Sequence, residues 1–225
     1  MYDIRKLSKI NLWLCFVPLT FRIFARMNTD NWSENVILAD ADYVDKVAFD
    51  LTVNFERMIG RRIPQADMAR WIDCVALDGG LREKEQADGN ETQVVLIHDK
   101  AATCMKHFTP SEYDSQLNGV AFKDHLGEFV LSSYPVESMT TKEDFFMDVL
   151  QTISQQKAVR RLMVIADDNI YSKVREALNR IGDNERHTTV FTMQPMPGGQ
   201  FRQEILGYSL MAALGIRSDE IKSES

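Results

Sequence analysis

Acidic residues follow four apolar runs of this sequence, at the points where buried strands would end. They are Asp40 with Asp42, Asp78, Asp99 after His98, and Asp167 with Asp168. In open parallel sheets, ligands bind outside the carboxyl ends of the strands, so these side chains are expected to face one crevice. Carboxylates that lie close together repel one another unless a cation neutralises them. Mg²⁺ and Mn²⁺ favour oxygen ligands, and the pattern therefore predicts a Mg²⁺ or Mn²⁺ site.

Helix capping is the alternative explanation for the same aspartates. Aspartate is a favoured N-cap that stabilises a helix by about 0.5–2 kcal/mol. Asp42 with Asp45 could open the helix that follows, and Asp167 with Asp168 also precede a helical pattern. Asp40 lies at the tip of the first apolar run, where capping explains it less well. The residues leave both interpretations open.

Apolar runs alternate with amphipathic patterns along most of the chain. Strands are predicted near residues 36–39, 73–80, 92–99, 161–168 and 188–193, with two more around the turn at Gly127; helices are predicted near 42–60, 140–153, 174–182 and 205–214. This alternation is typical of βαβ units. We expect an α/β fold, a Rossmann-like three-layer sandwich with a mainly parallel sheet of about five or six strands. Residues 27–225 are expected to form a single domain.

The first 26 residues differ from the rest of the chain. A mildly basic start leads into a twelve-residue apolar run, too short to span a bilayer, which needs about 20 residues. No small-residue cleavage site follows. We interpret residues 1–26 as an over-extended translation start, with a signal peptide or membrane anchor as the rival. Three cysteines without zinc spacing favour a reduced, cytoplasmic protein with no membrane span.

Composition and missing motifs narrow the function classes. The formal net charge is −7, which opposes general attraction to nucleic acid or anionic membrane. The chain has no G-x-G-x-x-G after the first strand, no P-loop and no G-x-S-x-G, which disfavours dinucleotide, nucleoside triphosphate and serine-hydrolase sites. The turn P-G-G-Q at 197–200 could offer backbone amides to a phosphate, although a plain glycine turn explains it as well.

Three segments together resemble a known family. They are D-A-D at 40–42, K-E-D-F-F-M-D-V-L at 142–150, and L-M-V-I-A-D-D-N-I-Y-S-K-V-R-E-A-L-N-R-I-G at 162–182. This series is similar to the NYN/PIN-like metal-dependent ribonucleases. The resemblance implies that Asp40, Asp144 and Asp167 are catalytic and hold Mg²⁺ or Mn²⁺, with Asp168 as a further metal ligand. It departs from the family where Tyr43 and Val44 replace an expected asparagine. The whole chain also resembles a family of unknown function from Bacteroidetes.

Three functions follow as hypotheses. The first is a PIN/NYN-like nuclease-type domain with RNA as its partner, or a descendant that has lost activity. The second is a non-catalytic Rossmann-like module that binds a small phosphorylated ligand, or a protein partner through the apolar C-terminal helix carrying Tyr208, Leu210 and Met211. The third is a hydrolase or transferase of a small phosphate ester that uses the same carboxylates.

Overall fold

The computed structural model describes residues 32–83, 90–181 and 185–221. The predicted leader at residues 1–26 lies outside this part, and residues from Ser33 onward form one compact unit. Among the described helices, none has the length and apolar character needed to cross a membrane.

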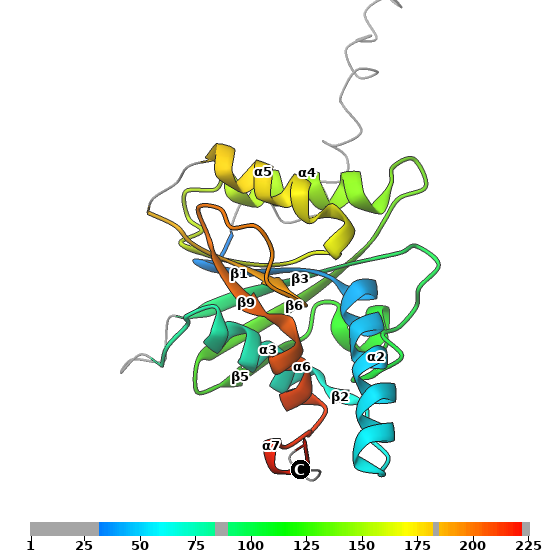
Figure 1. Cartoon of the computed structure of the whole chain (residues 1–225). Coiled ribbons are helices and arrows are strands. Elements are labelled where there is room, and N and C mark those ends of the chain that lie inside the picture. Colours follow the sequence, from blue (N-terminus) through cyan, green and yellow to red (C-terminus); the bar gives the residue numbers. More distant parts are fainter. Residues whose placement is uncertain (1–31, 84–89, 182–184, 222–225) are drawn as a thin grey trace, which may run out of the picture. The chain divides into compact units, whose positions relative to one another are not determined.

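The unit is built on a seven-stranded sheet with the order β5-β6-β3-β1-β7-β8-β9. Figure 1 shows the sheet between its covering helices. The strands are β1 (Asn35–Asp40), β3 (Glu91–His98), β5 (Ala121–Asp124), β6 (Gly127–Pro135), β7 (Arg161–Ile165), β8 (His187–Thr192) and β9 (Arg202–Ile205). Every pairing is parallel except that between β5 and β6. The predicted α/β class and mainly parallel sheet are confirmed, with one strand more than the upper predicted number.

Helices cover both faces of the sheet, giving the predicted three layers. One face carries α2 (Ala41–Ile59), α3 (Met68–Asp78) and α6 (Leu206–Ala213), while α4 (Lys142–Ser154) and α5 (Tyr171–Ile181) lie on the other (Figure 1). Shorter elements complete the unit: β2 (Ala66–Asp67) paired with β4 (Phe108–Thr109), the turns η2 (Tyr113–Leu117) and η3 (Asp168–Ile170), and α7 (Ser218–Ile221).

The central strand β1 accounts for the continuous apolar run at residues 36–39 of the sequence. All six residues of β1 are buried, because the strand is covered on both faces. Ile37 and Ala39 join the core beneath α2, α3 and α6, so the alternate residues Val36 and Leu38 point to the opposite face. A strand in this position has no solvent-facing side to be marked by polar residues.

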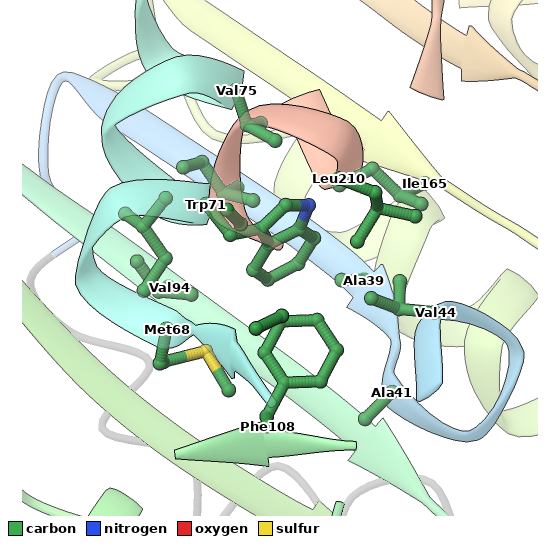
Figure 2. Close-up of a cluster of buried hydrophobic side chains, with 14 of the residues drawn as sticks. Ala39, Ala41, Val44, Met68, Trp71, Val75, Val94, Phe108, Ile165 and Leu210 are labelled. Atoms are coloured by element: carbon green, nitrogen blue, oxygen red, sulfur yellow. The ribbon is translucent and has the colours of Figure 1, made fainter. Parts of the chain in front are cut away.

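Trp71 of α3 lies at the centre of the larger core (Figure 2). The side chain is fully buried, and its ring meets Phe108 edge-on at a centroid distance of 5.6 Å. Leu210 of α6 and Ile165 of β7 are also buried in this cluster. Trp71 therefore belongs to one apolar cluster with residues of the seven-stranded sheet, of α6 and of the small β2–β4 sheet.

The predicted strand at residues 73–80 is wrong, because this segment belongs to α3. Asp67 caps the helix by accepting a hydrogen bond from the Arg70 amide at 3.1 Å. Trp71 and Val75, four residues apart, are then buried on the same face. A short apolar run has the same appearance in a buried helix and a buried strand. Asp78 consequently ends a helix and not a strand.

The path of the chain through the sheet places a crevice beside β1. From β1 the chain proceeds to β3 and β6 on one side, then crosses to β7, β8 and β9 on the other. Connections leaving β1 and β7 therefore diverge, which creates the switch point where doubly wound sheets bind ligands. We call the strand ends at Asp40, His98 and Ile165 the carboxyl edge, and the strand starts at Asn35, Arg161 and His187 the amino edge.

Candidate functional site

Asp40 ends β1 and is the N-cap of α2. The Tyr43 amide donates a 3.0 Å hydrogen bond to Asp40 Oδ1, so capping explains this residue better than its position at the strand tip indicated. Only 2% of the residue is exposed. Burial raises the pKa of the Asp40 carboxyl, whereas the neighbouring Lys142 ammonium and the Tyr43 amide act to lower it.

Lys142 supplies the cation of the crevice. Its Nζ donates to Asp40 Oδ1 at 2.9 Å and to Asp42 Oδ2 at 3.1 Å. Burial alone would lower the pKa of Lys142, but the two carboxylates outweigh burial and raise it. The ammonium thus remains protonated at neutral pH and neutralises Asp40 and Asp42 together. The lysine comes from the first turn of α4, 100 or more positions further along the chain than the two aspartates.

The Tyr43 phenol responds to Asp40 and to the acids that follow β7. Its hydroxyl and Asp168 Oδ1 are both buried. Burial is the largest effect and raises the pKa of the Tyr43 phenol. The negative charges of Asp168, Asp167 and Asp40 raise it further. Three of the predicted site residues therefore act electrostatically on one phenol group. Asp167 also accepts a 2.9 Å hydrogen bond from the Asn169 amide, as the cap of the turn η3.

Asp144 has local hydrogen bonds of its own. Thr141 Oγ1 donates to Asp144 Oδ2 at 2.7 Å, and the Asp144 amide lies 3.1 Å from the same hydroxyl. The Thr141 hydroxyl caps α4. Asp144 also acts on Lys173 of α5, which pairs with Glu143 at the surface. The carboxylate belongs to the helix start and is not part of the Asp40–Lys142 contact.

The remaining aspartates of the opening run hold neighbouring loops. Asp42 Oδ2 accepts from the Asp99 amide at 2.8 Å, in addition to Lys142. Asp45 accepts from the His107 amide at 2.7 Å and lies 3.2 Å from the His107 ring. The segment 99–107 is therefore fixed to α2 by two carboxylates. Helix capping alone does not explain Asp42 and Asp45, because both accept hydrogen bonds from backbone amides of a distant segment.

The Lys142 ammonium occupies the position between Asp40 and Asp42 in this structure. The ammonium already contacts Asp40 and Asp42, and Asp144 is bonded to Thr141. Over the described residues, the single group of metal-ligand side chains with ligand atoms mutually within 4.8 Å is Asp73, Asp124 and His125. The predicted ligands Asp40, Asp144, Asp167 and Asp168 do not form such a group in this conformation.

The group of Asp73, Asp124 and His125 lies where α3 meets the β5–β6 turn. Burial raises the pKa of Asp73, and the adjacent Asp124 raises it further. The His125 ring nitrogen lies 3.8 Å from Asp73, and about half of its side chain is exposed. Asp124 also accepts from the Leu126 amide at 2.7 Å, as part of the turn. These contacts account for the cluster as a polar surface contact.

Lys142 is the residue of this site that the sequence prediction missed. One signal was present: a lysine in the first helical turn opposes the positive end of the helix dipole, so its charge needs another reason to be there. One buried and one partly buried carboxylate at the start of another helix are such a reason. The sequence alone could not identify those carboxylates as its partners.

The predicted partner surface on the C-terminal helix is largely covered. Tyr208 is 69% exposed, but Leu210 is fully buried and Met211 is half-buried. The helix α6 packs against α3 as part of the core. An isolated exposed tyrosine is not the continuous apolar face that the protein-partner hypothesis required.

A family model matches residues 29–221, which is most of the chain, and its description is "Family of unknown function (DUF6621)". Searches of the curated proteins and of the solved structures each gave no match. The resemblance to NYN/PIN-like ribonucleases therefore stays a prediction from three short segments.

Proposed function

This chain belongs to the family of unknown function DUF6621, and the family description supplies no function. We therefore propose a function from the geometry of the carboxyl edge. The domain is a nuclease-like Rossmann module in which the Lys142 ammonium takes the place of a metal ion. The domain is a non-catalytic module that binds a ligand, and it does not hydrolyse phosphodiester bonds. The observation that carries this proposal is the contact of one ammonium with both Asp40 and Asp42.

The electrostatics support a resident lysine. Two carboxylates at a partly buried site need a positive charge, and a lysine supplies it without dependence on the metal concentration. The Lys142 side chain is 25% exposed and that of Asp40 is 3% exposed, so water screens the pair only in part. The raised pKa of Lys142 keeps the charge in place at neutral pH.

The net charge supports binding of something other than RNA. Affinity for nucleic acid comes largely from contacts of lysine and arginine with phosphates. The chain has 33 acidic against 26 basic residues, and the lysine of the crevice already contacts carboxylates. RNA is therefore not the ligand we propose for this edge.

A metal-dependent phosphodiester hydrolase is the second candidate. It is favoured by the combined electrostatic effect of Asp40, Asp167 and Asp168 on the Tyr43 phenol, since acids that end β1 and follow β7 act on one group. For this activity, Lys142 would have to leave Asp40 and Asp42. The two candidates consequently differ in how the protein responds to Mn²⁺.

Thermal unfolding with and without Mn²⁺ separates the candidates. We expect wild type to be unaffected by Mn²⁺, because the ammonium blocks the carboxylates. Lys142→Met frees Asp40 and Asp42, so its melting temperature should fall and should rise again when Mn²⁺ is added. A ligand at 100 times its Kd stabilises by about 2.7 kcal/mol, which is a shift of several degrees.

Two further variants make the experiment decisive. Lys173→Met removes an exposed lysine of α5 that pairs with Glu143, and it should show no response to Mn²⁺. Adding Asp40→Asn to Lys142→Met should abolish the recovery. A rise in melting temperature of wild type with Mn²⁺, together with RNA cleavage that Asp40→Asn eliminates, would instead establish the hydrolase.

A further inference from the structure

A cavity of about 260 Å³ lies at the amino edge, opposite the acidic crevice. Three of its lining residues begin strands: Arg161 of β7, His187 of β8 and Arg202 of β9. Thr188, Gln200 and Arg186 contribute further polar side chains. The lining contains three arginines and a histidine and includes no acidic residue. In a protein with a net charge of −7, this is a local concentration of positive charge.

Arg161 is held at the wall of the cavity. Its Nη1 donates to the Gly79 carbonyl at 2.9 Å, which fixes the direction of the side chain. Its Nε is buried and has no hydrogen-bond partner among the described residues. Burial lowers the pKa of Arg161, and the positive charge of Arg82 lowers it further. An arginine in this position would be stabilised by an anion.

Arg202 approaches the same point from β9. A Cβ placed on Gly80 would lie 2.9 Å from Arg161 Nη1 and 4.0 Å from Arg202 Nη1. Gly80 has a φ of +87°, a conformation that favours glycine, and the missing side chain leaves room for both guanidinium groups. Two guanidinium groups thus converge beside one glycine.

Arg186 adds charge without being mobile. Its three guanidinium nitrogens donate to the carbonyls of Val159, Ser154 and Gln156 at 2.6–2.9 Å. The side chain is therefore fixed in place by the backbone while it lines the cavity. A fixed cation loses little conformational entropy when a ligand binds.

The P-G-G-Q turn forms another side of the cavity. Gln200 and Phe201 are lining residues. A Cβ on Gly199 would lie 2.3 Å from the Phe201 ring, so only glycine permits the close packing of this turn. The Gln200 amide donates to Asn179 Oδ1 at 2.9 Å, which anchors the turn to α5. Phe201 offers an apolar surface beside the arginines.

Three acidic residues near the cavity lie outside its lining. Glu204 pairs with Arg202, whose side chain is 56% exposed, and Asp78 lies near Arg202 and Arg82. Glu34 acts on Arg161. Among the described residues, the lining itself carries Arg161, Arg186 and Arg202 and no acidic side chain.

We propose that this cavity binds a small phosphate monoester, with the phosphate between Arg161 and Arg202 and the esterified group beside Phe201. Guanidinium groups bind phosphate through paired charge-assisted hydrogen bonds. The site is separate from the Asp40–Lys142 crevice, so it stands or falls independently of the hydrolase question. It would give the binding module a ligand class.

Calorimetric titration with inorganic phosphate and phenyl phosphate, at constant ionic strength, tests the proposal. Wild type should bind both, and phenyl phosphate should displace inorganic phosphate. Arg202→Gln should weaken binding about tenfold, because a hydrogen bond to a charged group is worth about 1.4 kcal/mol or more. Arg161→Gln should weaken it by at least as much; since Arg161 also holds Gly79, Arg202→Gln decides the result if that variant fails to fold.

Arg160→Gln is the matched control. Arg160 precedes Arg161 but is not a lining residue of the cavity; it pairs with Glu185 and is 55% exposed. It should change phosphate affinity less than twofold. Equal losses in Arg160→Gln and Arg202→Gln would show general charge attraction and overturn the proposal. Phosphate binding no stronger than that of chloride would also overturn it, as would failure of phenyl phosphate to compete.

Discussion

The two edges of the sheet carry opposite charges and treat them differently. At the carboxyl edge, the carboxylates of Asp40 and Asp42 are satisfied by Lys142 and by backbone amides. At the amino edge, Arg161 and Arg202 line a cavity that includes no acidic residue. The carboxyl edge is where a doubly wound sheet is expected to bind its ligand, yet Asp40 and Asp42 there are already paired.

The position of a residue in the fold does not by itself make it part of a ligand-binding site. A strand-end carboxylate becomes available to a ligand only if no part of the chain occupies it first. Lys142 of α4 and the 99–107 segment occupy Asp40, Asp42 and Asp45. Arg161 beside the cavity, in contrast, has a buried Nε without a hydrogen-bond partner among the described residues.

The largest expected effect is that of removing Asp40. Asp40→Ala deletes the cap of α2 and leaves the Lys142 ammonium partly buried with Asp42 alone. Breaking a buried ion pair from one side costs about 3–5 kcal/mol. We expect a loss of this size in the free energy of unfolding, measured by urea denaturation.

Arg202→Ala is the counterpart at the amino edge. Its guanidinium is more than half exposed and pairs with Glu204 at the surface, so the loss should be below about 1 kcal/mol. Similar losses for Asp40→Ala and Arg202→Ala would remove the distinction between a structural edge and a binding edge.

A smaller effect is expected for the link between α2 and the loop before β4. Asp45→Ala removes the hydrogen bond from the His107 amide and the ring contact. The loss should be about 1–2 kcal/mol. Hydrogen exchange should accelerate around residues 105–109 and stay unchanged in β7 and β8. Asp50→Ala, on the exposed face of the same helix, should leave exchange in the loop unaltered.

The smallest effect concerns a pair away from both edges. Arg61 donates two hydrogen bonds to Glu220 at 2.8 Å, and these bonds with the Arg217 amide lower the pKa of Glu220 from 4.5 to about 2. Because the folded-state pKa is the lower one, the pair stabilises the fold fully above pH 4.5, and this contribution disappears as pH falls toward 2.

Comparison of Glu220→Gln with wild type over this pH range checks the expectation. The difference in their free energies of unfolding should be constant above about pH 5 and should shrink below 4.5. A difference that grows on acidification would mean that the Glu220 carboxyl is not stabilised as an anion. The Arg61–Glu220 pair belongs to neither edge of the sheet. Its effect on the free energy of unfolding therefore serves as a reference for the effects at the two edges.

Much of the fold followed from hydrophobic patterning. The runs within β1, β3, β7 and β8 are continuous because these strands are buried on both faces. The segment 73–80 was mistaken for a strand because a short apolar run does not distinguish a strand from a helix. The four-residue strand β9 was missed, since only its pairing with β8 makes it a strand.

The candidate site was predictable only in part. Asp40, Asp167 and Asp168 were identified as strand-end acids, and they do act on one phenol, that of Tyr43. Their metal-binding role stays a prediction. Lys142 was missed because its partners lie 100 or more positions away in the sequence. The arginines of the cavity come from separate segments, so no local motif marks them.

The sequence by itself determined the layered α/β architecture and the presence of acids at the strand ends, because burial periodicity and strand-end position are local properties. Tertiary structure decided what those acids do. Folding brings Lys142 of α4 onto Asp40 and Asp42, and it gathers Arg161, Arg186 and Arg202 around one cavity. Coulomb interactions depend on distance in space, and for residues on different elements only the packed chain sets that distance.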